Sequence, residues 1–378
     1  MPRIRLEFLD GLRGLTAFYV LVYHLVTVLT VQWGVVYPPA VQSVVSWMMP
    51  AHAAVAIFIV LSGYCLMLPV AKASDKQLRG GFGEYLRRRA RRILPPYYAA
   101  LVLSLLAIGV AMLLQRHEGG DQKTYQEAFS AGSVLSHLFL VHNLNVDWAN
   151  RINGPMWSVA TEWQIYFVFA LLLLPVWRKF GNGAVLVVAY GLGLAPTLLL
   201  PPEKSFYWAY PYFLGLFALG MVGATVPFTS VREQETWRER VPWGTLSALL
   251  FALYYLLLGL GKLEPLWLSE TLVGVIAVCL ILHCTLSATR QETSKTNWVR
   301  RFLESRSMAA LGGFSYSLYL TQHIVMQAMA MLGRKLHASP IAALTLNLAI
   351  GIPVALVFAY TMSWFFERPF LAQKKPSA

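Results

Sequence analysis

Long apolar stretches recur along the whole chain of 378 residues. A helix that crosses a bilayer needs about 20 apolar residues, within a range of about 17–25, and lipid offers its backbone no other hydrogen-bond partner. The sequence therefore predicts an all-α polytopic membrane protein with about ten transmembrane helices. The expected spans are residues 12–31, 51–71, 94–114, 158–177, 184–200, 206–224, 243–260, 267–287, 313–332 and 340–366. The apolar segment 134–146 is too short to span, so we expect it to lie at an interface or to re-enter.

The composition supports a membrane protein. Only 13% of the residues are charged and 57% are hydrophobic, whereas about a quarter of the residues of a soluble domain are charged. Twelve Trp and eighteen Tyr suit the interfacial belts of a bilayer. The three cysteines, Cys65, Cys279 and Cys284, all lie in apolar segments, so we expect small buried side chains rather than a disulfide framework or a zinc site.

The net charge of +13 is distributed unevenly. With ten spans, 24 of the 31 lysines and arginines fall on the side of the two termini and 7 fall on the other side. The positive-inside rule then predicts that both termini are cytoplasmic and that the charge reports topology, not a nucleic-acid partner. We expect a single membrane domain over residues 1–378, with a core at about 10–370 and a cytoplasmic tail at 371–378. Glu7 and Asp10 precede the first span, which predicts a retained helix rather than a signal peptide.

Arg13 and His24 are the ionisable pair of the first span. They are eleven residues apart, almost three turns, so they share one helical face and are separated by about 16 Å. His24 is therefore expected near mid-membrane, where ionisable groups are costly and commonly functional. A neutral imidazole is well suited to accept a proton. The alternative is a histidine that hydrogen-bonds a neighbouring helix.

An arginine cluster stands at the inner mouth of the third expected span. Its members are Arg87, Arg88, Arg89, Arg91 and Arg92. One interpretation is a topology signal that also binds anionic lipid headgroups. The other is a phosphate clamp, because guanidinium forks match phosphate geometry. Pro95 and Pro96 follow and are expected to begin the helix.

Glu162 lies a turn into the fourth expected span, between Trp157 and Trp163. The tryptophans are interpreted as interfacial anchors. The carboxylate could remain hydrated near the headgroups, or it could face the bundle and there orient His24 or bind a hydroxylated acceptor.

Three further motifs place polar residues within, or at the end of, apolar helices. Ser62, Gly63 and Tyr64 lie within the second span, where small residues favour close helix approach. The spacing of Tyr316, Tyr319 and His323 puts them on one face, where interhelical hydrogen bonds are expected and an acceptor site is the alternative. Glu367 and Arg368 close the last span and are expected to form an interfacial ion pair.

Taken together, these fragments resemble one family, the integral-membrane acyltransferases of acyltransferase family 3. The resemblance covers nearly the whole chain, from Asp10 to Phe370, and the fragments occur in the family's order. They are Leu9–His24, Phe58–Tyr64, Arg89–Pro95, Trp157–Tyr166, Ser315–Leu320 and Glu367–Pro369.

The resemblance implies a function. Members move an acyl group, usually acetyl from acetyl-CoA, onto hydroxyls of surface polysaccharides, lipids or small molecules. It implies that acetyl-CoA is the co-substrate, that no metal is needed, and that the protein lies in a plasma membrane, the inner membrane of a bacterium. Membrane lipids are further partners, and homo-oligomerisation is left open. The chain ends after its tenth expected span, so we do not expect the esterase-like domain that some members carry.

The resemblance also implies roles for individual residues. His24 and Arg13 are the essential pair and Glu162 is the third catalytic candidate. The donor site is assigned to Arg88, Arg89, Arg92, Ser62 and Tyr64, and the acceptor site to Trp157, Tyr316 and Tyr319. The family often has histidine where this chain has Gln322, so His323 receives no role.

The expected mechanism threads acyl-CoA into the membrane from a basic inner mouth towards His24. His24 acts as general base on the acceptor hydroxyl, or carries the acyl group itself. Two other functions remain open. One is a proton-coupled transporter or flippase of an amphiphilic anion, and the other is an acyl-delivery partner of a separate transferase.

Overall fold

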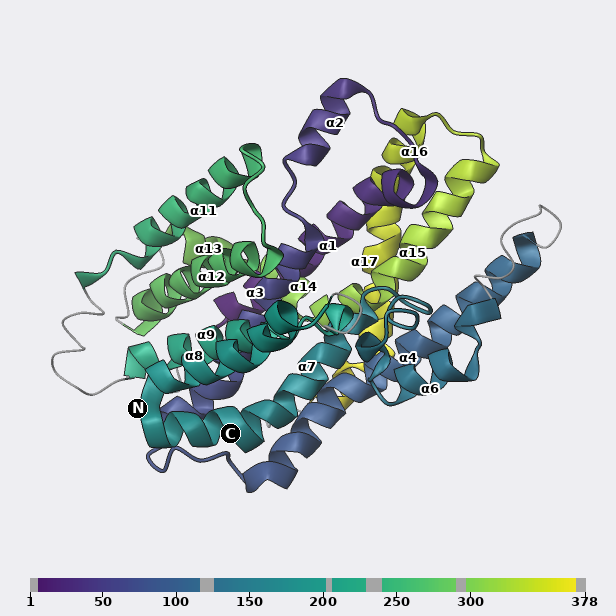
Figure 1. Cartoon of the computed structure of the whole chain (residues 1–378). Helices are drawn as coiled ribbons and strands as arrows, with labels where there is room; N and C mark the ends of the chain where they lie inside the picture. The colour runs from purple at the N-terminus through teal and green to yellow at the C-terminus, as the bar shows by residue number, and fades with distance from the viewer. Residues whose placement is uncertain (1–5, 116–125, 202–205, 229–239, 290–296, 372–378) are drawn as a thin grey trace.

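The computed structural model describes residues 6–115, 126–201, 206–228, 240–289 and 297–371. Within these ranges the regular structure is helical and no strand occurs, which confirms the all-α prediction. The expected cytoplasmic tail lies outside the described residues beyond Leu371. Figure 1 shows α1 running through the middle of the helices, with α15 and α17 on one side and α3 and α9 on the other.

Long helices make up most of the protein. They are α1 (Phe8–Trp33), α3 (Ala51–Lys72), α4 (Gly81–Gln115), α7 (Met156–Val168), α8 (Leu174–Leu199), α9 (Phe213–Thr225), α11 (Trp243–Gly259), α12 (Leu266–Thr289), α15 (Ser315–Lys335) and α17 (Ile352–Phe366). Short helices connect them: α2 (Pro39–Ser46), α6 (Ala131–Leu138), α13 (Trp298–Leu303), α14 (Arg306–Gly312) and α16 (Pro340–Leu346). Single turns of π-helix, Phe169–Leu173 and Asn347–Gly351, join α7 to α8 and α16 to α17.

Seven helical runs among the described residues are long and apolar enough to cross a membrane, so the expected count of about ten is not confirmed. These runs are Phe8–Val31, Pro39–Lys72, Gly81–Leu114, Met156–Leu199, Tyr207–Phe228, Leu266–Thr289 and Pro340–Phe370. They give the chain the character of an integral membrane protein.

The difference in count has identifiable causes. The expected spans 158–177 and 184–200 both fall in the run Met156–Leu199, whose backbone breaks at Gly181 with φ 82°. The expected span 243–260 is α11, which has only 17 residues. The expected span 313–332 falls in α15, whose tyrosines, glutamines, histidine and basic residues make it less apolar than the seven.

Helix α4 begins earlier than the sequence suggested. Pro95 and Pro96 were expected to start the helix, but α4 begins at Gly81 and passes through both prolines. A proline inside a helix cannot donate to the carbonyl four residues before it and also crowds that carbonyl. Helix α4 nevertheless continues through both prolines, without the two backbone hydrogen bonds that their N–H groups would have made. The arginine cluster therefore lies on a regular helix, where it is divided between two faces.

The segment 134–146 forms α6 and the 3-10 turn His142–Leu144, and neither belongs to a candidate span. His137 and His142 are both fully buried, and their rings stack with centroids 3.8 Å apart. Whether the segment lies at an interface or re-enters stays a prediction.

Helices α3 and α9 cross at two glycines. A Cβ on Gly63 would clash with the carbonyl oxygen of Phe217, and one on Gly220 would clash with that of Val60. Lipid tails are as apolar as leucine, so the hydrophobic effect does not drive helices together inside a membrane. Close backbone approach and dense packing hold them together instead. The expected packing role of Gly63 is confirmed.

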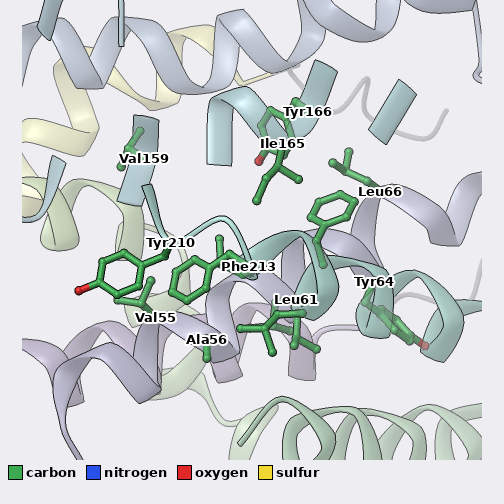
Figure 2. Close-up of a cluster of buried hydrophobic side chains, with 14 of the residues drawn as sticks. Val55, Ala56, Leu61, Tyr64, Leu66, Val159, Ile165, Tyr166, Tyr210 and Phe213 are labelled. Atoms are coloured by element: carbon green, nitrogen blue, oxygen red, sulfur yellow. The ribbon is translucent and has the colours of Figure 1, made fainter. Parts of the chain in front are cut away.

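A buried apolar cluster fills the space between α3, α7 and the segment that begins α9. Figure 2 shows Val55 and Leu61 of α3 facing Val159 of α7 and Phe213 of α9. This cluster fixes α3 against α7, and the candidate site lies between these two helices and α1, α4 and α15.

Candidate functional site

A cavity opens between α1, α3, α4, α7 and α15. It encloses about 810 Å³ of space outside the atoms, including space open to solvent. Its lining changes along its length from basic to apolar. The lining residues are Arg13, Val55, Phe58, Ile59, Ser62, Cys65, Leu66, Arg89, Arg92, Ile93, Ser158, Val159, Glu162, Tyr166, Ser315, Tyr316 and Tyr319.

Three arginines form the basic end of the cavity. Arg13 comes from α1, and Arg89 and Arg92 come from α4, three residues apart and therefore on one face. The positive charges of Arg13 and Arg89 both act on Arg92. Like charges held together in a cavity favour an anion between them, and guanidinium groups suit phosphate.

Arg13 is held in place from two sides. Its Nη1 donates to Oδ1 of Asp10 at 3.1 Å, and its Nη2 donates to Sγ of Cys65 at 3.0 Å. Cys279 and Cys284 are buried as the sequence predicted, whereas Cys65 is only half-buried and lines the cavity. Nε of Arg89 is buried and has no hydrogen-bond partner among the described residues.

The rest of the arginine cluster turns away from the cavity. Arg88 donates to the backbone oxygen of Arg79 at 2.8 Å and pairs with Glu84 at 3.4 Å, while Arg87 pairs with Glu84 at 2.8 Å. Arg91 is exposed. The structure thus brings Arg89 and Arg92 to the site and leaves Arg88, which was assigned to the donor, on the outer face of α4.

Glu162 occupies the middle of the cavity. Its Oε1 accepts a hydrogen bond from Ser62 of α3 and another, at 2.6 Å, from the Tyr166 hydroxyl. Its charge also acts on Arg13. Among the described residues its hydrogen-bond partners are thus Ser62 and Tyr166 rather than His24. Ser62 thus lines the cavity, and the role in helix packing that was expected of it stays a prediction.

The far end of the cavity is apolar. The rings of Phe58 and Tyr319 meet edge to face with centroids 5.7 Å apart. The hydroxyl groups of Tyr319 and Ser158 are hydrogen-bonded at 2.7 Å, which ties α15 to α7 at this level. Tyr316, one turn away on α15, donates to the backbone oxygen of Ile93 at 3.3 Å. The predicted shared face of Tyr316 and Tyr319 is therefore the face towards the cavity.

His24 lies beyond this apolar end, not on the cavity wall. It is half-buried, and the carboxamide of Gln322 interacts with its ring. His52 and His323 are close enough for their charges to interact with His24. Three imidazoles thus gather near the apolar end of the cavity. In the described part of the chain, no group of three or more His, Cys, Asp or Glu side chains is arranged to hold a metal ion.

Two residues assigned to the site lie away from the cavity. Tyr64 is fully buried, and its hydroxyl is 2.7 Å from that of Thr285. Trp157 was interpreted as an interfacial anchor, but it is 6% exposed and its ring stacks with His52 at 5.3 Å and packs against Tyr210 at 4.6 Å. Its position is explained by the aromatic residues after Phe206, which cover the start of α7.

The expected ion pair of Glu367 and Arg368 is wrong, since the two side chains diverge. Glu367 is buried and accepts a 2.6 Å hydrogen bond from Ser317. The guanidinium group of Arg368 lies over the rings of Tyr360 and Trp364, at 4.7 and 5.1 Å from their centroids.

Three residues of the site were missed by sequence reasoning. Cys65, Tyr166 and His52 had no assigned role. His52 offered a signal, because it is an ionisable residue in an apolar run, as His24 is. Cys65 and Tyr166 offered none, since a cysteine or tyrosine in an apolar helix is most often core.

Comparison with known proteins gives a consistent result. The family model of acyltransferase family 3, described as an acyltransferase domain, matches residues 6–366. The peptidoglycan O-acetyltransferase OatA of Listeria monocytogenes is 22% identical over 328 residues, which cover 82% of this chain and 48% of that protein. The O-acetyltransferase OatA of Staphylococcus aureus is 20% identical over 324 residues, 82% of this chain and 49% of that protein. The chain thus spans about half the length of these relatives. No solved structure gives a significant match.

Proposed function

Because the chain belongs to acyltransferase family 3, whose model covers residues 6–366, we propose that it is a membrane O-acetyltransferase. It moves an acyl group from cytosolic acyl-CoA to a hydroxyl of an acceptor in or beyond the membrane. The observation that carries this proposal is a cavity with three arginines at one end and His24 beyond the other.

The basic end suits the donor. Arg13, Arg89 and Arg92 would bind the phosphates of CoA through charge-assisted hydrogen bonds. The uncharged pantetheine arm and the thioester would extend past Ser62 and Glu162 towards the apolar end. Arg13 and His24 are on one helix, about 16 Å apart, so α1 fixes the distance between the phosphate end and the reacting end.

His24 performs the chemical step as a general base. The imidazole takes the proton of the acceptor hydroxyl, the oxygen attacks the thioester carbonyl, and the C–S bond breaks. The leaving CoA thiolate takes the proton from the imidazolium and departs as the thiol. The side chain of Gln322, on α15, lies beside the imidazole. In the two-step variant the imidazole itself attacks first, and the acyl group then passes to the hydroxyl.

Glu162 fixes α3 and α7 relative to each other at the cavity. It also provides a carboxylate that a hydroxylated acceptor can bind. It joins α3 to α7 through Ser62 and offsets part of the arginine charge. The acceptor that we propose is a surface glycan, since the Listeria relative is named for peptidoglycan. The acceptor roles expected of Tyr316 and Trp157 stay predictions, since Tyr316 hydrogen-bonds to Ile93 beside Arg92 and Trp157 is buried away from the cavity.

The experiment uses inverted membrane vesicles that contain the full chain and enclose soluble peptidoglycan fragments. Radiolabelled acetyl-CoA is added outside, on the cytoplasmic face. We expect label on the enclosed glycan hydroxyls and CoA thiol outside. Intact acetyl-CoA or label inside without esterified glycan would contradict the proposal and indicate a carrier. Transfer that requires a second added protein would indicate a delivery partner.

A further inference from the structure

The cavity has an apolar end on the side of His24. We propose that Phe58 and Tyr319 set the length of the acyl group and restrict the donor to short chains, an inference that rests on the function proposed above. The described lining at this end is Val55, Phe58, Ile59, Val159 and Tyr319, with the hydroxyl of Ser158 beside them.

The direction of entry follows from the charges. CoA is anionic at its nucleotide end and neutral at its acyl end, and the arginines lie at the opposite end of the cavity from Phe58. The acyl group therefore leads, and its terminal methyl is the first atom to meet the aromatic pair. Each added methylene then moves the thioester carbonyl back towards the arginines and away from His24.

The two rings narrow the apolar end together. Their edge-to-face contact at 5.7 Å joins α3 to α15, and such pairs are favourable beyond their buried area. Tyr319 is fixed by its hydrogen bond to Ser158 and is 7% exposed. Phe58 is apolar, half-buried and held by packing, so it is the ring whose removal would lengthen the cavity.

A pocket of fixed length discriminates strongly between homologous chains. One methylene too many or too few in an apolar pocket typically changes discrimination by about 10- to 200-fold. Acetyl and hexanoyl groups differ by four methylenes, and hexanoyl-CoA remains soluble enough for a clear binding measurement. These two donors are therefore the probes.

The test measures the dissociation constants of acetyl-CoA and hexanoyl-CoA for the purified full chain by calorimetry. We expect the unmodified protein to bind acetyl-CoA at least about tenfold more tightly. Phe58→Ala is expected to lower this ratio to about one or to reverse it, and Phe58→Leu to give an intermediate ratio. Tyr319→Phe keeps the ring and should keep the ratio.

The matched control is Ile57→Ala. Ile57 is also half-buried, is the neighbour of Phe58 on α3 and does not line the cavity. It should leave the ratio unchanged. Equal affinities in the unmodified protein, or the same ratio in Phe58→Ala and Phe58→Leu as in the unmodified protein, would overturn the inference. Selective binding without any acyl transfer would contradict the proposed function and leave the length selection standing. Absence of acetyl-CoA binding would contradict both.

Discussion

Ser62 on α3 donates a hydrogen bond to Oε1 of Glu162 on α7, although the two residues are 100 positions apart in the sequence. The same oxygen accepts from the hydroxyl of Tyr166, one turn further along α7. A carboxylate that accepts hydrogen bonds from two hydroxyl groups is fixed in its position. Glu162 therefore connects the two walls of the cavity at its midpoint.

Replacement of this carboxylate by an amide should slow transfer. Glu162→Gln keeps the size of the side chain but gives Ser62 and Tyr166 a neutral acceptor. Hydrogen bonds to charged groups exceed neutral ones by about 1–2 kcal/mol, so we expect a loss of about 5- to 30-fold in kcat/KM. The control is Glu127→Gln, which changes a carboxylate that pairs with Arg151 outside the cavity. Equal turnover in both variants would rule out a role for Glu162.

The arginine cluster can be divided into two halves by charge reversal. We expect Arg89→Glu with Arg92→Glu to weaken CoA binding by at least about tenfold, because two charge-assisted phosphate contacts are lost. Arg87→Glu with Arg88→Glu changes the net charge of the same helix equally, but those side chains face away and pair with Glu84. CoA affinity measured on membranes separates the two interpretations. If both double variants behaved alike, the cluster would be a topology signal only.

The unequal distribution of lysine and arginine between the two sides of the membrane predicts which loops face the cytoplasm. In a variant without the three native cysteines, an impermeant maleimide should label Lys262→Cys from outside intact cells. Asp75→Cys and Lys374→Cys should react only after permeabilisation. Lys123 and Lys295, which also differ in predicted side, lie outside the described residues, as does Lys374. An odd number of crossings would place the termini on opposite faces, so outside labelling of Lys374→Cys would contradict the predicted topology.

The stacked histidines of α6 and the turn after it predict acid sensitivity. Burial lowers the pKa of His137 to about 4, and burial together with the neighbouring His137 lowers the pKa of His142 to about 3. In the unfolded chain both have a pKa of 6.5. The unfolded chain therefore binds more protons below about pH 6.5, and folded-state stability falls as the pH decreases from there towards 4.

A thermal-unfolding series from pH 7.5 to 5 measures this effect. Each histidine contributes at most about 1.4 kcal/mol per pH unit of this interval. The double variant His137→Gln, His142→Gln should have a Tm that depends less on pH than that of the unmodified protein. Parallel Tm curves would show that other groups cause the acid sensitivity.

The sequence alone indicates which residues come together at the site. It is less informative about the direction in which each side chain points. Arg13, Arg89, Arg92, Ser62 and Glu162 all line one cavity, and their roles there stay predictions. Arg13 and Glu162 could be singled out without knowledge of the neighbouring helices, because an ionisable side chain in an apolar helix is costly.

The direction in which a side chain points depends on the neighbouring helices. Tyr64 follows the Ser-Gly pair but turns to Thr285 of α12, because Ser62 and Tyr64 lie on different faces of α3. Arg88 differs from Arg89 by one position, about 100° around the helix, and that rotation separates the outer face from the cavity. The burial of Trp157 depends on Tyr210 and Phe213, which no local pattern places beside it.

The proposed mechanism requires His24 to take the proton or the acyl group during transfer, and acetyl transfer by His24→Gln tests this role. Glutamine keeps much of the hydrogen-bonding capacity of histidine but cannot accept the proton. Loss of a positioned base typically costs about 10²–10⁴-fold in rate, and loss of a covalent carrier costs nearly all of it. We predict that the purified variant folds and binds acetyl-CoA as the unmodified protein does, yet transfers no more acetyl than His24→Ala. Near-normal turnover by His24→Gln would show that His24 has only a structural role beside Gln322. That result would contradict the proposed mechanism.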